Sequence, residues 1–533
     1  MIKRILGVTA LAAGVAHAQG VSAIREYEPG IDIEHYAFRV TIPDSGRHIA
    51  VDATIRLRRT RAVDELILDL ASAMRLTRVS VGGQDVKATV DARGVHVGLG
   101  ACANVPCAAV VSIGVAGEPA DGLIISQDPQ GRWQYFADHW PNRAHNWLPV
   151  VDHPSDKATV EWTVDAPSAL TVIGNGVKAV GPGKPGRTIT KWASDIPIPV
   201  YLMTIGVAPM TRVDLGQTAC AIKCVPQDVY EAPELGPRTP PGFAAADRIV
   251  TWLSRFVAPF PYEKLSHVES STRFGGMENA SAIFYADGQF RRMTLGEGLV
   301  AHETSHQWFG DAVTEARWSD LWLSEGFATY FAALYEREAR GDSGFRTALS
   351  RIRAAVLSNA VVKERPVIDT TETDLMKLLN RNSYEKGGFV LHMLRNEVGD
   401  SAWIRGIRSY WNAHRNGNAL SDDLRQAVER ESHTDLRWFF TQWLTRPGYA
   451  ELTTSWDFSG SLVVTIEQGA RFGAYRLRLP VEIERADGTV ARVTLDVPAN
   501  AHAQLTVPGR YAQRPKSVKF DPDGDVLAVI TQR

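Results

Sequence analysis

Three things are scarce in this sequence: long hydrophobic runs, cysteine and net charge. A transmembrane helix needs about 20 consecutive apolar residues, and no stretch of this sequence is that long. The 58 Lys and Arg residues balance 60 Asp and Glu residues, and the two signs are mixed along the chain. Without a basic patch, the chain lacks the electrostatic feature that attracts nucleic acid or anionic lipid. Four cysteines in 533 residues also exclude a small disulfide scaffold.

The cysteines lie in two local pairs. Cys102 and Cys107 bracket four residues, and Cys220 and Cys224 bracket three. We expect each pair to form a short disulfide in an oxidising compartment. A zinc site is the alternative, but neither spacing is C-x₂-C and no histidine flanks the cysteines.

The N-terminus has the pattern of a secretory signal. Lys3 and Arg4 precede the apolar run Ile5–Val15, and a small-x-small tripeptide follows. This pattern predicts a signal peptide over residues 1–18, cleaved before Gln19. An N-terminal anchor is the alternative, but the run is too short to span a bilayer. We therefore expect an exported protein, periplasmic or secreted, without stable membrane insertion after cleavage.

The apolar period changes twice along the chain, which predicts a multidomain α+β protein. Over residues 19–212, short alternating runs broken by Gly, Pro and Asp indicate an antiparallel β domain. Over 213–447 the period is mostly helical, interrupted by strand-like text near Gly275. Over 448–533 the alternation returns, and we expect a small β-sandwich.

A five-residue motif in the helical part points to a metal site. Residues 302–306 read His-Glu-Thr-Ser-His, and histidines at i and i+4 project from one helix face, so both can reach one zinc ion. Glu303 can then face a water molecule on the metal. The capping-box pattern Thr294–Glu297 predicts that the helix begins there and ends near Gly310 and Asp311. Taken alone, His302 and His306 could be an ordinary surface or core pair.

A carboxylate supplies the third predicted ligand. Ser324 begins a second predicted helix, with an apolar stripe over residues 327–335. Glu325 lies in its first turn, off the stripe and 19 positions after His306. If the two helices pack antiparallel, one Zn²⁺ gains two nitrogens and one oxygen, with a fourth position open for water. The alternative for Glu325 is a carboxylate that interacts favourably with the helix dipole.

These segments match a known family. The text VAHETSHQWFGD and LWLSEGFATY closely resembles the gluzincin metallopeptidases, in particular the aminopeptidase N family. Residues Pro259–Leu265 resemble the family's approach segment. The resemblance implies a thermolysin-like catalytic domain over 213–447, a zinc cofactor and peptide substrates with a free N-terminus. Many relatives continue into a helical C-terminal domain, and this sequence resembles the short forms without it.

A second motif resembles the family's G-x-M-E-N signature and consists of Gly275, Gly276, Met277, Glu278 and Asn279. Paired glycines let another backbone approach, so a peptide could add alongside as a strand. Glu278 would then face the substrate's α-ammonium, which selects exopeptidase action. The alternative is a glycine bulge with a solvated glutamate.

Two further roles rest mainly on the resemblance. Tyr384 occupies the position of the family's catalytic tyrosine, where a phenol can donate to the oxyanion. Relatives place a second amine-contacting residue in the N-terminal domain, and here the resemblance implies Asp138, with Gln134 as the alternative. Most lone tyrosines are packing residues.

The motifs together predict a zinc aminopeptidase in which Glu303 is the general base. A thermolysin-like endopeptidase would share the metal site. A secreted peptide-binding protein with an inactive peptidase core is the alternative from another class, although all three ligands and Glu303 are intact. The family also includes an epoxide hydrolase activity that would use the same zinc. The sequence leaves the oligomeric state open.

Overall fold

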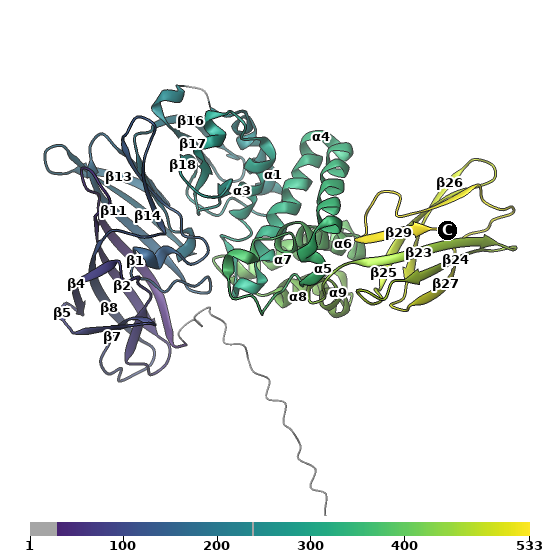
Figure 1. Cartoon of the computed structure of the whole chain (residues 1–533), viewed down its shortest axis with the longest axis horizontal. Helices are drawn as coiled ribbons and strands as arrows, with labels where there is room; N and C mark the ends of the chain where they lie inside the picture. Colours follow the sequence, from purple (N-terminus) through teal and green to yellow (C-terminus); the bar gives the residue numbers. More distant parts are fainter. Residues whose placement is uncertain (1–28, 237–238) are drawn as a thin grey trace, which may run out of the picture.

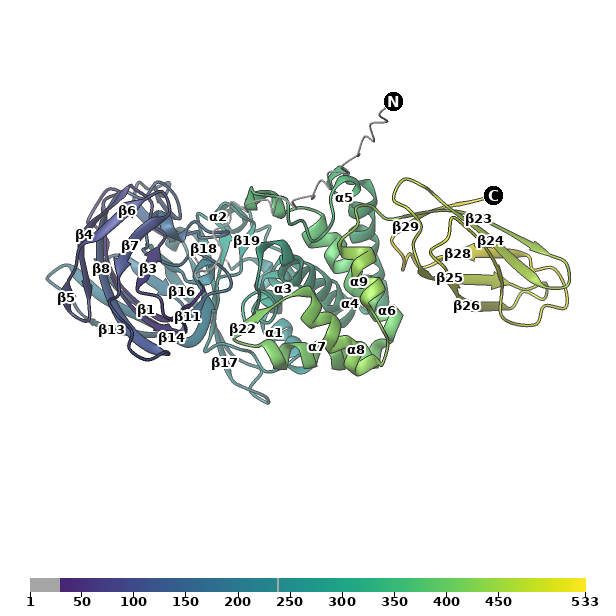
Figure 2. The same cartoon turned by 90° about the horizontal axis from the view of Figure 1, so that it is seen from below.

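The computed structural model describes residues 29–236 and 239–533. The predicted signal segment 1–18 lies outside these residues. Three regions follow one another along the molecule: N-terminal strands, a helical middle and C-terminal strands (Figure 1). The view from below shows the same order (Figure 2). Within the described ranges, no helix is both long enough and apolar enough to cross a bilayer.

The N-terminal region is built on an eight-stranded sheet with the order β13-β14-β11-β1-β2-β8-β4-β5. Residues of β2 alternate strictly between buried and exposed, as the sequence pattern predicts for a sheet with one face on the core. Neighbours are antiparallel except β1 and β11, which run parallel. The strands are β1 (Ile31–Thr41), β2 (Ile49–Arg59), β4 (Met74–Val81), β5 (Gln84–Asp85), β8 (Cys107–Gly117), β11 (Lys157–Pro167), β13 (Val177–Pro182) and β14 (Arg187–Pro199).

Two smaller sheets complete this region, and one of them faces the helical middle. In the sheet with the order β12-β15-β10-β9, Asp138 directly follows β10. Phe136 of β10 packs edge-on against Phe284 of the next region, with 5.7 Å between the ring centroids. The structure also pairs Cys102 with Cys107. The strands are β3 (Glu65–Leu68), β6 (Ala88–Asp91), β7 (Gly94–Gly98), β9 (Leu123–Gln127), β10 (Trp133–Ala137), β12 (Thr171–Gly174) and β15 (Ile205–Ala208).

The middle region begins with a five-stranded sheet in the order β16-β17-β18-β20-β19. The expected domain boundary at 212 falls inside β16, which pairs with β17. The two-residue strand β19 pairs with β20 alone and forms one edge of the sheet. A bond between Cys220 and Cys224 closes the loop between β16 and β17. The strands are β16 (Thr211–Thr218), β17 (Val225–Glu231), β18 (Leu265–Ser270), β19 (Gly276–Met277) and β20 (Ala282–Ala286).

Helices make up the rest of the middle region. The long helix α4 is interrupted at Gly341, whose positive φ breaks the helical geometry. Phe309, just beyond α3, stacks on Phe327 of α4 at 4.4 Å and ties the two helices together. The helices are α1 (Ala246–Phe256), α2 (Asp287–Arg291), α3 (Glu297–His306), α4 (Trp322–Ser358), α5 (Ala360–Glu364), α6 (Gly387–Val398), α7 (Asp400–His414), α8 (Ser421–Ser432) and α9 (Arg437–Leu444), with a short strand pair β21 (Val313–Glu315) and β22 (Gly417–Ala419).

Both ends of α3 differ from the prediction. Gly296 is the N-cap, and no side chain caps the first turn of this helix. Glu297 instead accepts hydrogen bonds from Tyr335 and Arg340, each at 2.6 Å, so tertiary partners replace the expected capping box. The helix ends at His306 rather than near Gly310, because Gly310 adopts φ +118° and its N–H bonds to the Val313 carbonyl.

The C-terminal region contains a four-stranded sheet, β27-β24-β23-β29, and a three-stranded sheet, β26-β25-β28. It contacts the helices through Asp525, which lies 2.9 Å from His392 of α6, and through Arg353 of α4, which donates to the Ala528 carbonyl at 2.6 Å. The strands are β23 (Ala450–Phe458), β24 (Leu462–Gln468), β25 (Leu477–Glu484), β26 (Val490–Val497), β27 (His502–Thr506), β28 (Ser517–Phe520) and β29 (Ala528–Gln532).

Candidate metal centre and substrate cleft

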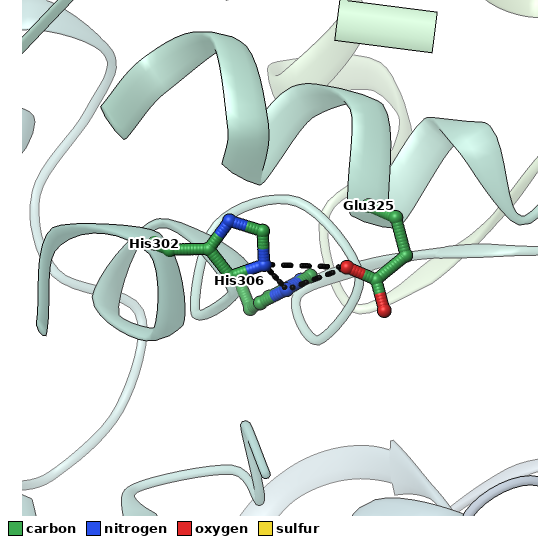
Figure 3. Close-up of side chains that lie close together, drawn as sticks. All are labelled: His302, His306 and Glu325. Atoms are coloured by element: carbon green, nitrogen blue, oxygen red, sulfur yellow. Dashed lines mark hydrogen bonds and ion pairs between the residues drawn. The ribbon is translucent and has the colours of Figure 1, made fainter. Parts of the chain in front are cut away.

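Two helices bring three ligand atoms together. His302 and His306 project from α3, and Glu325 projects from the first turn of α4 (Figure 3). Oε2 of Glu325 lies 3.3 Å from Nε2 of each histidine, and the two Nε2 atoms lie 3.2 Å apart. Within the described part of the chain, this is the one such group of three or more side chains that could share a metal ion.

The spacing of these atoms fits a tetrahedral metal ion. Zn²⁺ binds His nitrogen and carboxylate oxygen at about 2.0–2.2 Å, which places tetrahedral ligands about 3.3–3.5 Å from one another. The observed separations of 3.2 and 3.3 Å match that geometry. Two imidazoles and one carboxylate also form one of the known donor sets of catalytic zinc sites. His302, His306 and Glu325 therefore fit zinc and leave a fourth position for a water molecule or a substrate.

The ring of His306 is oriented by its second nitrogen. Nδ1 of His306 lies 3.3 Å from the Phe309 carbonyl and 3.0 Å from Oγ of Ser324. A proton on Nδ1 can be donated to the carbonyl, which leaves the Nε2 lone pair free for a metal. Gln307 braces the turn after the helix, because its amide donates to Asp311 at 2.7 Å and to the Glu278 carbonyl at 2.8 Å.

Glu303 lies in the same cleft and is almost fully buried, at 5% exposure. Burial raises the pKa of its carboxyl well above the usual range, and the charges of Glu278 and Glu325 add to that rise while His306 opposes it. A glycine is needed beside it, because a Cβ added at Gly276 would overlap the Glu303 carboxylate. The G-G-M-E-N strand and the H-E-x-x-H helix are therefore in direct contact.

A cavity of about 470 Å³ opens over the three ligands. Its polar side chains are Glu278, Glu303 and Tyr384 together with the ligand set. Apolar side chains form the rest of the wall: Trp140, Phe274, Met277, Leu299, Ala332 and Leu379. Such a mixture of a few convergent polar groups and apolar walls is typical of a small-molecule or peptide site.

Tyr384 lies beside the predicted metal ligands, on a single π-helical turn (Asn382–Lys386) that leads into α6. Its hydroxyl donates to Oε1 of Glu325 at 2.7 Å, and its ring stacks on His302 with 6.1 Å between centroids. The approach of this turn to α4 requires glycines, because a Cβ at Gly326 would lie 2.9 Å from the backbone of Gly387.

Four of the five G-G-M-E-N residues line the cavity. These are Gly275, Gly276, Met277 and Glu278. Burial raises the pKa of Glu278 to about 7. Asn279 does not line the cavity; it is 1% exposed, and its carbonyl accepts a hydrogen bond from Ala282.

Neither candidate for the second amine-contacting residue lines the cavity. Asp138 is fully buried, and its Oδ1 lies 3.0 Å from Nη2 of Arg143. Gln134 lies in a separate pocket and donates to Ser126 at 3.0 Å. The placement of Asp138 therefore speaks against direct contact with a substrate amine, because its carboxylate is already paired.

The cleft also contains residues whose roles the motifs did not indicate. Phe274 and Leu299 line the cavity, and Ser324 and Gln307 hold His306 and its turn. Phe274 directly precedes the glycine pair, and Ser324 directly precedes Glu325. Their position beside the motifs was the only sequence signal available for them.

Comparison with known proteins agrees with this geometry. The peptidase family M1 domain matches residues 244–443, and the peptidase M1 N-terminal domain matches residues 33–202. The chain belongs to peptidase family M1. These matches confirm the resemblance to the aminopeptidase N family. They also confirm the N-terminal β domain and the helical domain that carries the metal motif.

Several relatives in this family are aminopeptidases. The chain is 25% identical to leucyl aminopeptidase of Saccharolobus solfataricus over 74% of its own length and 51% of that protein. It is 27% identical to aminopeptidase N of Streptomyces lividans over 59% of this chain and 38% of that one. The chain thus spans about half the length, or less, of these curated relatives.

Solved structures of the family share the fold. An M1 zinc metallopeptidase from Deinococcus radiodurans superposes with a TM-score of 0.69 at 26% identity. The match covers 78% of this chain and 94% of that chain. A mutant of the same enzyme, solved with the peptide Tyr-Ser-Ala bound, gives the same TM-score at 25% identity.

We predict that His306→Ala abolishes metal binding, because the substitution removes one of the three metal ligands. Elemental analysis after dialysis should find about one zinc per wild-type chain and less than about a tenth of that in the variant. The control is His502→Ala, which removes an exposed histidine from β27. A zinc content that His306→Ala leaves unchanged would contradict the assigned site.

Proposed function

We propose that this protein is a zinc aminopeptidase that removes the N-terminal residue of peptides. One observation carries the proposal: three metal ligands and a buried glutamate, Glu278, face the same cavity beside the free edge of β19. The relatives named as aminopeptidases support exopeptidase action over endopeptidase action.

Zinc held by His302, His306 and Glu325 would polarise the scissile carbonyl and lower the pKa of a bound water toward neutrality. Glu303 accepts the proton of the attacking water at its carboxylate and returns it to the leaving amine. Glu303 lines the same cavity as the three ligands, so one carboxylate can make both transfers.

Tyr384 stabilises the oxyanion. Without substrate its hydroxyl donates to Glu325 at 2.7 Å, so the phenol already lies beside the carboxylate that binds the metal. Burial raises the pKa of this phenol well above its usual value, which keeps the proton on the oxygen. When the carbonyl becomes tetrahedral, the O–H can turn to the new negative charge.

Glu278 and β19 position the substrate. The backbone groups along the open edge of β19 can pair with an extended peptide, as in strand addition. Glu278 then meets the α-ammonium, and this ion pair places the first peptide bond at the metal. The tripeptide bound to the Deinococcus enzyme mutant supports peptides as the substrate class.

The first prediction from this proposal concerns the base. Glu303→Gln should retain zinc but lose at least about 10³-fold in kcat, because the amide cannot accept the proton. The assay compares an amino-acid amide with its N-acetylated form, and wild-type enzyme should cleave the free amine alone. Near-normal turnover by the metal-replete variant would refute the base, and equal cleavage of both substrates would favour an endopeptidase.

A second prediction concerns Gly276. Gly276→Ala should lower kcat by about 10²-fold at full zinc content, because the new methyl group displaces the Glu303 carboxylate. Gly296→Ala is the matched control. Gly296 lies at the start of α3, the helix that carries Glu303, and a Cβ added there meets open space. An unchanged kcat in Gly276→Ala would show that the contact does not constrain the base.

We infer that the two C-terminal sheets, one of four strands and one of three, pack face to face as a β-sandwich.

We also infer that the protein is exported. Residues 1–18 have the signal pattern, and the two disulfides suit an oxidising compartment. Mass spectrometry of the protein from the periplasm or medium should find an N-terminus at Gln19. Recovery from the cytosol with residues 1–18 attached would contradict export.

A further inference from the structure

Four charged side chains form a cluster at the junction of the N-terminal region and the cleft: Asp121, Asp138, Arg143 and Arg273. Nη1 of Arg143 lies 3.0 Å from Asp121, and Nη2 lies 3.0 Å from Asp138. Arg273 bonds to Asp121, and its backbone N–H lies 3.5 Å from Oδ2 of Asp138. Two carboxylates are thus balanced by two guanidinium groups.

Asp138 is the most enclosed member of this cluster. Its exposure is 0%, whereas the side chains of Asp121 and Arg273 are 30% and 51% exposed. A buried carboxylate is stable when it is paired, and removal of its partner leaves a costly isolated charge. Arg143 forms this ion pair with Asp138, and Asp138 does not line the cavity, so its carboxylate is not placed to contact a substrate ammonium.

The cluster contacts both aromatic residues of the cavity wall. Nε of Arg143 donates to the Trp140 carbonyl at 2.7 Å, and its guanidinium lies 5.9 Å from the ring centre of Phe274. Phe274 directly follows Arg273, and it packs edge-on against Trp140 at 6.1 Å. One wall residue therefore comes from the N-terminal region and the other from the loop into β19, and the ion pairs join the two.

This aromatic wall, Trp140 and Phe274, lines the same cavity as Glu278, and Phe274 lies four positions before Glu278 in the segment that forms β19. The first residue of a peptide carries the α-ammonium. Its side chain must therefore lie beside the wall nearest Glu278.

We infer that the ionic cluster positions Trp140 and Phe274 as an apolar wall that selects large apolar side chains at the N-terminal residue. Asp138 is then a positioning residue, and Glu278 is the carboxylate that holds the amine. This inference rests on the proposed aminopeptidase function. It assigns a different role to Asp138 from the amine contact that the family resemblance implies.

The test compares kcat and KM for phenylalanyl, leucyl and alanyl 4-nitroanilides. Wild-type enzyme should prefer the two large residues to alanine by about tenfold or more in kcat/KM, because each buried methylene adds discrimination. Asp138→Asn should reduce that preference by about tenfold, through KM for the large residues, with the alanyl substrate changed less than about threefold. Glu278→Gln should raise KM for all three alike.

Two further variants keep the test decisive. Asp165→Asn breaks an ion pair of the same region, 2.7 Å from Arg187, that does not line the cavity, and it should leave the preference unchanged. If Asp138→Asn does not fold, Arg273→Gln replaces it, because that side chain is half exposed. Arg273→Gln should also reduce the preference for large residues.

The outcomes separate the two proposals. If wild-type enzyme cleaves none of the substrates, the aminopeptidase function fails. If it cleaves them with no preference for large residues, the function stands and the inference is overturned. If Asp138→Asn raises KM equally for alanyl and phenylalanyl substrates, as Glu278→Gln does, Asp138 contacts the amine and the positioning role is wrong.

Discussion

The packing of α3 against α4 is the constraint on which the rest of the cleft depends. It places two imidazole nitrogens and one carboxylate oxygen within 3.2–3.3 Å of one another in a buried site. Such a group is stable only with a cation at its centre or with altered protonation, because the interior screens charge poorly. Phe309 stacked on Phe327 and Gly326 against Gly387 maintain the geometry from both sides.

The N-terminal region takes part in the site as well as supporting it. Trp140 comes from this region and lines the cavity, while Arg143 reaches across to Phe274 and Asp121 to Arg273. The cleft is therefore assembled from two regions of the chain. Under the proposed aminopeptidase function, a change in the N-terminal region would alter selectivity without touching the metal ligands.

How much could be predicted from sequence depends on how local each interaction is. The spacing of His302 and His306 is a property of one helix, and Glu325 lies in the first turn of the next predicted helix, 19 positions after His306, so the ligand set could be named. The ends of α3 could not, because Glu297 is drawn to Tyr335 and Arg340 from a distant helix. The surroundings of Asp138 could not be predicted either, because the backbone it approaches belongs to Arg273, 135 positions away.

The edge strand β19 is only two residues long. Long, open edges in a sheet invite pairing with other copies of the same protein, and natural proteins limit that risk by keeping edges short. An edge of this length offers too few backbone groups to template such assembly, yet enough to hold the beginning of an extended chain. For a protein that acts on peptides as proposed, such an edge would pair with a substrate backbone without templating aggregation at the same strand.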